Sequence, residues 1–317
     1  MSTAFVFPGQ GAQVIGMGKA LADEYAASKA VFDEVDDALG EKLSSLIWEG
    51  ELDELTLTQN AQPALMATSL AAMRALESEG VTMDTAAFVA GHSLGEYSAL
   101  AASGALSIAD AARLLRTRGQ AMQAAVPVGE GAMAALLGLD MEGARKVAER
   151  AAADLGRVCQ AANDNDPTQV VISGHADAVQ HAVELAREAG ARRAVMLPVS
   201  APFHCALMQP AADVMAEALS HVEINEPKVP LVANVLAHSC DQPATIRSLL
   251  VDQVTHSVRW RESVQWMAQQ GVDTYWELGA GKALCGMIRR IHKGAGMKAI
   301  TNPDEVRAAA QSIADAA

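Results

Sequence analysis

The sequence has few residues that can crosslink the chain and no long apolar run. Four cysteines occur in 317 residues, widely separated, at Cys159, Cys205, Cys240 and Cys285. That spacing gives neither the close pairs of a zinc site nor the density of a disulfide framework. The longest apolar runs, such as 99–102 and 133–139, are far shorter than the roughly 20 residues of a membrane-spanning helix. The N-terminus also lacks the pattern of a secretory signal, so we expect a cytoplasmic protein with reduced cysteines and no membrane partner.

Basic residues are scarce relative to acidic ones. Lys and Arg total 24, whereas Asp and Glu total 38, which gives a formal net charge of −14. Nucleic-acid binding needs clustered positive charge for phosphate contacts, so this composition argues against it. An acidic protein partner would need a local basic patch, and the segments 192–193 and 289–293 are the candidates. Both are equally consistent with an ordinary solvated surface.

Motifs for metals and nucleotide cofactors are also missing. No histidine or cysteine spacing matches a metal site, and no glycine fingerprint of a dinucleotide fold is present. The segment 279–282 resembles part of a phosphate-binding loop, but it lacks the earlier glycine and has no Ser or Thr after Lys282. We therefore expect neither a cofactor nor a metal.

Strand-like and helical segments alternate along the chain. The apolar runs 5–7 and 86–90 predict buried strands, and the alanine-rich stretch 64–79 predicts a long helix between them. This alternation favours a parallel sheet covered on both faces. The length is sufficient for two compact units.

The pattern changes between residues 131 and 199. We expect strands at 132–139, 158–162, 169–174 and 194–199, and helices at 141–154 and 176–189. The order β-α-β-β-α-β is that of a small ferredoxin-like unit. We therefore predict a small domain at 131–199, inserted into a large domain formed by 1–130 and 200–317. The large domain would continue with a loop and helix at 202–220, a helix at 260–269 and a strand at 274–278.

A candidate nucleophile follows the second predicted strand. Gly91-His92-Ser93-Leu94-Gly95 fits the G-x-S-x-G pattern, in which a sharp strand-to-helix turn points the serine outward. The start of the next helix would aim unsatisfied N–H groups at a developing oxyanion. The alternative is a structural serine in a glycine turn. Neighbouring residues on such a turn point in different directions, so we expect a structural role for His92.

Arg118 lies on an apolar helical stripe. The helix beginning near Ser107 places one set of residues on a single face: Ala111, Leu114, Leu115, Arg118 and Met122. A buried guanidinium must find an anion or several acceptors, because its desolvation is costly. One interpretation is a structural salt bridge to a buried Asp or Glu. The other is that the anion arrives with the substrate, as a carboxylate that the planar guanidinium binds with two hydrogen bonds.

The residue pattern alone does not identify the base that would serve Ser93. His204 follows the predicted strand 194–199 in a loop, which is a usual position for such a histidine, but His175, His221 and His256 are also candidates. Gln10 follows the first strand among glycines, where it is either a turn residue or an oxyanion contact.

Seven ordered segments carry a resemblance to a known family. They are 7–13, 91–97, 116–119, 163–167 (a loop before the strand 169–174), 201–204, Gln253 with 258–260, and 277–279. Over nearly the whole chain, the sequence resembles the malonyl-CoA:acyl-carrier-protein transacylases and the acyltransferase domains of fatty-acid and polyketide synthases. The resemblance implies an α/β fold, with an α/β-hydrolase-like large domain and an inserted ferredoxin-like small domain.

The resemblance also implies residue roles. Ser93 would be the nucleophile and His204 the general base and acid. Arg118 would bind the substrate carboxylate, Gln10 and the backbone N–H of Leu94 would form the oxyanion hole, and the backbone carbonyl of Gln253 would orient the histidine. Phe203 resembles the aromatic residue of malonyl-selective members, whereas Asp166 stands where the family often has serine.

The implied function is transfer of the malonyl group from malonyl-CoA to the phosphopantetheine thiol of holo-acyl carrier protein, through a malonyl-serine intermediate, in fatty-acid synthesis. We expect a monomer. Three alternatives share the same motifs: a serine thioesterase or esterase, a polyketide-pathway acyltransferase, and a non-catalytic module that docks a carrier protein.

Overall fold

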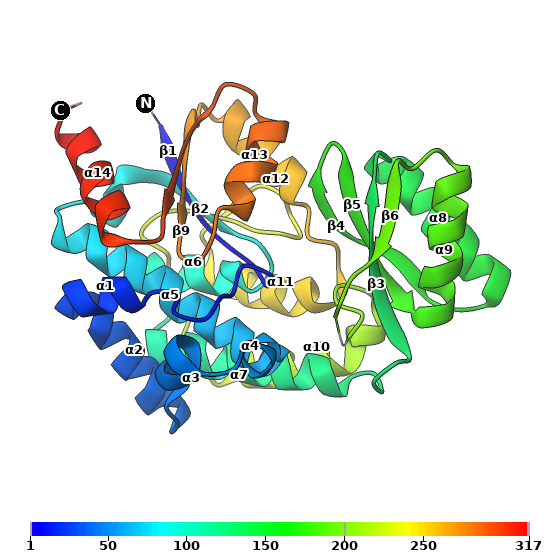
Figure 1. Cartoon of the computed structure of the whole chain (residues 1–317), viewed down its shortest axis with the longest axis horizontal. Helices are drawn as coiled ribbons and strands as arrows, with labels where there is room; N and C mark the ends of the chain where they lie inside the picture. Colours follow the sequence, from blue (N-terminus) through cyan, green and yellow to red (C-terminus); the bar gives the residue numbers. More distant parts are fainter. Residues whose placement is uncertain (1, 200, 316–317) are drawn as a thin grey trace.

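Two α/β units make up the structure, a computed structural model that describes residues 2–199 and 201–315 (Figure 1). The larger unit has a six-stranded sheet in the order β10-β9-β1-β2-β7-β8. Its strands are β1 (Thr3–Phe7), β2 (Ala86–Gly91), β7 (Leu231–Val232), β8 (Ser239–Cys240), β9 (Thr274–Leu278) and β10 (Gly296–Ile300). All neighbours pair in parallel except β7 and β8. The predicted parallel α/β fold class is confirmed.

Helices cover both faces of this sheet. They are α1 (Lys19–Glu24), α2 (Ala26–Leu39), α3 (Leu43–Glu49), α4 (Leu52–Thr56), α5 (Thr58–Ser78), α6 (Gly95–Ala102), α7 (Ile108–Ala124), α10 (Gln209–Ser220), α11 (Pro243–Thr255), α12 (Trp260–Gln269), α13 (Ala283–Ile291) and α14 (Pro303–Ala314), with single turns η1 (Met83–Thr85) and η2 (Ala206–Met208). Successive side chains of β1 point to opposite faces. Ala4 and Val6 pack with α12 and α13, while Phe5 and Phe7 join the main core with α5, α6 and α7.

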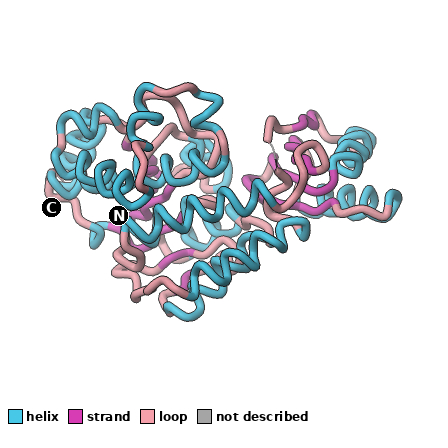
Figure 2. The backbone as a smooth tube through the Cα atoms, turned by 90° about the horizontal axis from the view of Figure 1, so that it is seen from below, coloured by secondary structure: helices cyan, strands magenta, loops and turns pink. Residues whose placement is uncertain are grey.

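The smaller unit has a four-stranded antiparallel sheet in the order β4-β5-β3-β6. In chain order its elements are β3 (Gly131–Leu137), α8 (Met141–Leu155), β4 (Cys159–Asp166), β5 (Gln169–His175), α9 (Ala176–Glu188) and β6 (Arg193–Met196). This is the predicted β-α-β-β-α-β order. A separate apolar core joins α8 and α9 to the sheet, and Figure 2 shows this unit set to one side of the large unit's helices.

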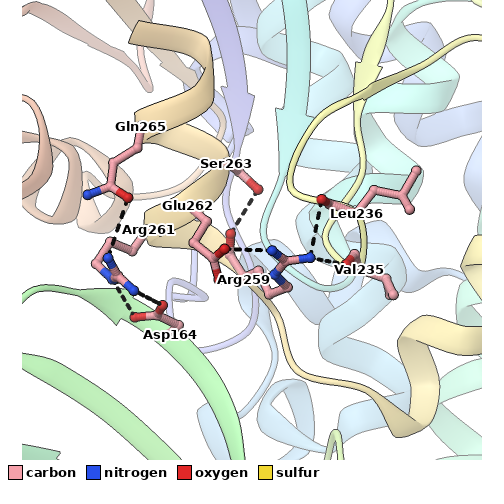
Figure 3. A network of polar contacts seen from close by, with 8 residues as sticks. All are labelled: Asp164, Val235, Leu236, Arg259, Arg261, Glu262, Ser263 and Gln265. Atoms are coloured by element: carbon pink, nitrogen blue, oxygen red, sulfur yellow. Dashed lines mark hydrogen bonds and ion pairs between the residues drawn. The ribbon is translucent and has the colours of Figure 1, made fainter. Parts of the chain in front are cut away.

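Strand β4 is longer than the sequence pattern predicts. It continues to Asp166 and so includes most of the segment 163–167, which was expected to be a loop. Asp and Asn disfavour strands in general, but here two buried carboxylates pair with arginines of the large unit. Asp164 lies 2.8 Å from Arg261 of α12 (Figure 3), and Asp166 lies 2.8 Å from Arg290 of α13. These tertiary ion pairs override the local preference and fasten the small sheet to the large unit.

Other element limits differ less from expectation. Helix α5 begins at Thr58 rather than at residue 64, and β6 ends at Met196 rather than at 199. The elements of the small unit lie within the predicted insertion 131–199, whereas residues 1, 200, 316 and 317 of the predicted large domain lie outside the described residues.

Three compositional expectations can be compared with the described part of the chain. All four cysteines are free thiols. None of the helices in the described ranges combines the length and apolarity that crossing a bilayer requires. Within the same ranges, no group of three or more His, Cys, Asp or Glu residues is arranged to hold a metal ion.

Candidate active site

Ser93 sits on a tight turn between β2 and α6. Its φ angle is 53°, in the left-handed region that non-glycine residues rarely adopt. The flanking glycines are required by space, because a Cβ on Gly91 would lie 1.9 Å from the backbone of Gly95. A Cβ on Gly95 would lie 2.2 Å from the carbonyl oxygen of Phe7 on the neighbouring strand. The turn therefore has the geometry of a nucleophile elbow.

His204 contacts the serine directly. Its Nε2 lies 2.8 Å from Ser93 Oγ, and its Nδ1 lies 2.8 Å from the backbone carbonyl oxygen of Gln253. A carbonyl only accepts hydrogen bonds, so Nδ1 carries the proton in the neutral ring and Nε2 is free to accept from the serine hydroxyl. Burial, assisted by the charge of Arg118, lowers the pKa of His204 to about 3. The ring is therefore a neutral base next to a hydroxyl.

Arg118 projects from α7 toward the same serine. Its Nη2 donates to Ser93 Oγ at 3.1 Å and to Gln253 Oε1 at 2.8 Å, and its Nη1 donates to Gln62 Oε1 at 2.8 Å. The side chain is 1% exposed. Within residues 2–199 and 201–315, no carboxylate forms an ion pair with it and its Nε has no hydrogen-bond partner. The structural salt bridge considered above is thus absent there, and the guanidinium retains an unused donor.

Two possible oxyanion donors lie at the same edge of the sheet. Leu94 is the N-cap of α6, and its N–H has no backbone acceptor among the described residues. Gln10 lies in the loop after β1, which pairs in parallel with β2, so the two loops leave the sheet at the same end. The Gln10 amide makes one long contact, 3.4 Å from Nε2 to Thr58 Oγ1. Turning this amide toward a bound carbonyl would therefore break one weak contact among the described residues.

Two buried polar residues that sequence reasoning did not single out support the elbow. Asn234 Oδ1 accepts from the Ser93 N–H at 2.8 Å, and its Nδ2 donates to the Gly91 carbonyl at 2.6 Å. Glu96 Oε2 accepts from Gln253 Nε2 at 2.8 Å. Glu96 lies in the segment 91–97, but nothing in its local pattern indicates these partners. Asn234 is 141 residues away from Ser93 in sequence, so no local signal could have revealed it.

His92 and the three other candidate bases point elsewhere. His92 Nε2 lies 2.8 Å from Asn165 Oδ1 of β4, which is the structural role expected for it. His175 accepts from a backbone N–H in the small unit, His221 contacts Glu217, and His256 contacts the backbone of its own helix. Of the four candidate bases, His204 is the one that contacts Ser93.

The left-handed serine, its histidine and the parallel sheet beneath them define the class: an α/β enzyme with a serine–histidine pair on a nucleophile elbow. Comparison with known proteins narrows this class. A family model described as an acyl transferase domain matches residues 4–301. The chain belongs to this acyl transferase family.

Relatives match over almost their full length. The malonyl CoA-acyl carrier protein transacylase of Bacillus subtilis is 47% identical over 310 residues, covering 98% of this chain and 96% of that protein. The crystal structure of an acyl-carrier-protein S-malonyltransferase from Bartonella henselae is 55% identical, with a TM-score of 0.96 and coverage of 99% and 100%. A malonyl-transacylase solved in complex with a type II polyketide acyl-carrier protein is 39% identical, with a TM-score of 0.95 and coverage of 98% and 100%.

Proposed function

We propose that this chain is a malonyl-CoA:acyl-carrier-protein transacylase, which moves the malonyl group from malonyl-CoA to the phosphopantetheine thiol of holo-acyl carrier protein. Its family and its near-full-length relatives support the activity. One observation favours malonyl in particular: Arg118 is buried against Ser93 with amide and hydroxyl partners and an unused donor. The malonyl carboxylate supplies the missing anion.

In the first half-reaction His204 Nε2 removes the proton from Ser93 Oγ as the oxygen attacks the thioester carbonyl carbon. The Leu94 N–H and the Gln10 amide stabilise the oxyanion that forms. Collapse of this intermediate breaks the C–S bond, and the coenzyme A sulfur leaves with the proton from His204. The product is malonyl-Ser93. Arg118, which donates to Ser93 Oγ at 3.1 Å, also favours the developing negative charge on that oxygen.

The second half-reaction uses the same groups in reverse. The phosphopantetheine thiol gives its proton to His204 and its sulfur attacks the ester carbonyl. Ser93 Oγ leaves and recovers a proton from the imidazolium. The Gln253 carbonyl holds the ring through Nδ1 in both halves. A neutral carbonyl fixes the tautomer but stabilises imidazolium less than a buried carboxylate would. The cycle uses protein groups throughout and requires no cofactor.

The net charge of −14 would repel an acidic carrier protein, so its recognition needs a local basic patch. We assign it to the exposed arginines of the two basic segments, 289–293 at the end of α13 and 192–193 where β6 begins. Arg289→Glu is expected to raise the KM for the carrier protein and leave acylation by malonyl-CoA unchanged. We also propose a cytoplasmic monomer, which size-exclusion chromatography with light scattering tests for its oligomeric state.

The decisive experiment mixes the purified protein with malonyl-CoA alone and locates any adduct by peptide mass spectrometry. A malonyl group on the Ser93 peptide that transfers to added holo-carrier protein is the expected result. Many turnovers of free malonate without an adduct would instead identify a thioesterase. If neither an adduct nor turnover is observed, the result would indicate a non-catalytic docking module. Fatty-acid and polyketide carrier proteins, compared as acceptors, distinguish the two pathways.

A further inference from the structure

Glu96 is a buried carboxylate that the proposed cycle does not use. It lies in the first turn of α6, directly beneath the elbow, and is 1% exposed. Its Oε2 accepts from Gln253 Nε2 at 2.8 Å and from the Asn234 N–H at 3.1 Å. Both partners are N–H donors, so Oε2 acts as an acceptor whether or not the carboxyl group is ionised.

This contact fixes the orientation of the Gln253 side-chain amide. Nε2 faces three acceptors: Glu96 Oε2 at 2.8 Å, the Ser93 carbonyl at 3.0 Å and, at the longest distance, Asn234 Oδ1 at 3.4 Å. Oε1 consequently faces Arg118 Nη2 at 2.8 Å. The flipped amide would set its oxygen against those three acceptors and its NH2 against a cation that can only donate. The orientation that serves Arg118 is therefore the one that Glu96 stabilises through the shortest of these three contacts.

Glu96 also contributes charge in its ionised form; burial raises the pKa of its carboxyl group to about 7. Burial lowers the pKa of Arg118, and the nearby Tyr97 and Glu96 oppose that shift. The carboxylate is thus close enough to influence the guanidinium electrostatically while its hydrogen bonds go to Gln253 and Asn234 rather than to the arginine. Arg118 is held in place without having its binding face occupied by an internal anion.

We propose that Glu96 is a positioning residue for acyl-group specificity, which acts through the Gln253 amide to hold Arg118 ready for the substrate carboxylate. This inference rests on the proposed malonyl transfer. A purely structural Glu96 would affect malonyl and acetyl substrates equally. A positioning Glu96 affects the malonyl substrate selectively, because only that acyl group has a carboxylate to bind.

The test measures kcat/KM for acylation by malonyl-CoA and by acetyl-CoA. Glu96→Met removes the acceptor while keeping the volume, and it is expected to lower the malonyl-to-acetyl ratio by about 10- to 100-fold, the range for one hydrogen bond to a charged group. Glu96→Gln keeps an acceptor oxygen and should retain the ratio within about threefold of wild type, since hydrogen bonding through a neutral acceptor is worth somewhat less. An unchanged ratio in Glu96→Met, or a loss in Glu96→Gln as large as that in Glu96→Met, overturns the proposal.

A double-mutant cycle tests whether Glu96 acts through the Gln253 side chain. If Glu96 acts through Gln253, adding Glu96→Met to Gln253→Met should lower the malonyl-to-acetyl ratio little further. Multiplicative effects of the two substitutions would show instead that the two residues act independently. If Glu96→Met does not fold, Gln253→Met alone removes the amide that links Glu96 to Arg118. An unchanged malonyl-to-acetyl ratio in Gln253→Met would also overturn the proposal. The wild-type protein is assayed first. Its failure to form malonyl-Ser93 would refute the proposed function, while a working wild type with unaffected variants would refute only this inference.

Discussion

Ser93 and His204 meet across 2.8 Å from two backbone positions that both have left-handed φ angles, 53° and 58°. Such angles cost about 1–3 kcal/mol each when surrounding contacts enforce them. Asn234 holds the serine end through the Ser93 N–H, and the Gln253 carbonyl holds the histidine ring. The scaffold thus fixes the separation of the two reactive atoms, and each part can be tested separately.

Replacing the nucleophile should abolish the acyl-enzyme. Ser93→Ala is expected to form no malonyl adduct by intact-mass spectrometry, because Ser93 has the one hydroxyl that contacts His204 within residues 2–199 and 201–315. Ser98→Ala is the matched control: its hydroxyl is buried in α6 and has no hydrogen-bond partner among the described residues. It should acylate normally. An adduct on Ser93→Ala would show that the nucleophile lies elsewhere.

The carboxylate-binding role of Arg118 predicts a change in substrate preference. Arg118→Ala should lower kcat/KM for malonyl-CoA on the order of 10²–10³-fold, since a buried bidentate charged contact is lost. Acetyl-CoA, which has no carboxylate, should lose much less or gain. Arg113→Ala on the same helix, whose side chain is 57% exposed, is the control and should leave both substrates unaffected. Equal losses of kcat/KM for both substrates would contradict the carboxylate-binding role of Arg118.

The low pKa of His204 predicts activity that tolerates acid. A histidine of ordinary pKa, about 6.5, would be neutral in only about 3% of molecules at pH 5, whereas His204, with a pKa lowered to about 3, remains neutral. The acylation rate constant should therefore vary less than about threefold between pH 7 and pH 5, measured in single-turnover mixing. Burial raises the pKa of Glu96 to about 7, so Glu96→Gln is measured in parallel. A midpoint near 6.5 that persists in Glu96→Gln would contradict the prediction.

The same histidine should make the fold less stable in acid. As pH falls below about 6.5 the unfolded chain binds a proton at His204, while the folded chain does not until about pH 3. The contribution of His204 to the free energy of unfolding is thus fully present above pH 6.5 and declines below it, by up to about 1.4 kcal/mol per pH unit. In urea unfolding, the free energy of unfolding of His204→Gln should rise relative to that of wild type as pH falls from 6.5 to 5. A constant difference would mean that His204 titrates normally in the folded state.

Asn234 should matter to both stability and rate. Asn234→Ala leaves the Ser93 N–H and the Gly91 carbonyl without their side-chain partners, which we expect to cost about 2–4 kcal/mol in the free energy of unfolding and to slow acylation at least about tenfold. Asn60→Ala is the control, since Asn60 is also buried and bonded but holds the Glu54 carbonyl and Arg116. It should lose stability while acylating at the wild-type rate. Similar slowing in both variants would point to general destabilisation.

Features carried by short sequence patterns were predictable. The helix 260–269 and the strand 274–278 have the expected limits, and the periodic apolar stripe of α7 correctly buries Arg118. The G-x-S-x-G pattern also located a turn whose glycines leave no room for a side chain. In each case the information lies within a few residues, where backbone geometry and side-chain periodicity act.

Features that depend on distant partners were not predictable from the residues themselves. Choosing His204 over three other histidines required the family resemblance, because its contact with Ser93 spans 111 residues. The extension of β4 depends on Arg261, 97 residues away from Asp164. Asn234 and Glu96 show the same limitation, since a buried polar residue is identified by the groups that surround it in the folded chain.

The hydrogen bond between His92 and Asn165 has a consequence for engineering. The small unit reaches across to the residue beside Ser93, and the ion pairs of Asp164 and Asp166 anchor the same strand. A chimera that grafts the small unit of another family member at its outer boundaries would therefore also replace part of the nucleophile's support. Grafts that retain residues 163–166 from the recipient should keep the catalytic turn in register while exchanging the rest of the insert.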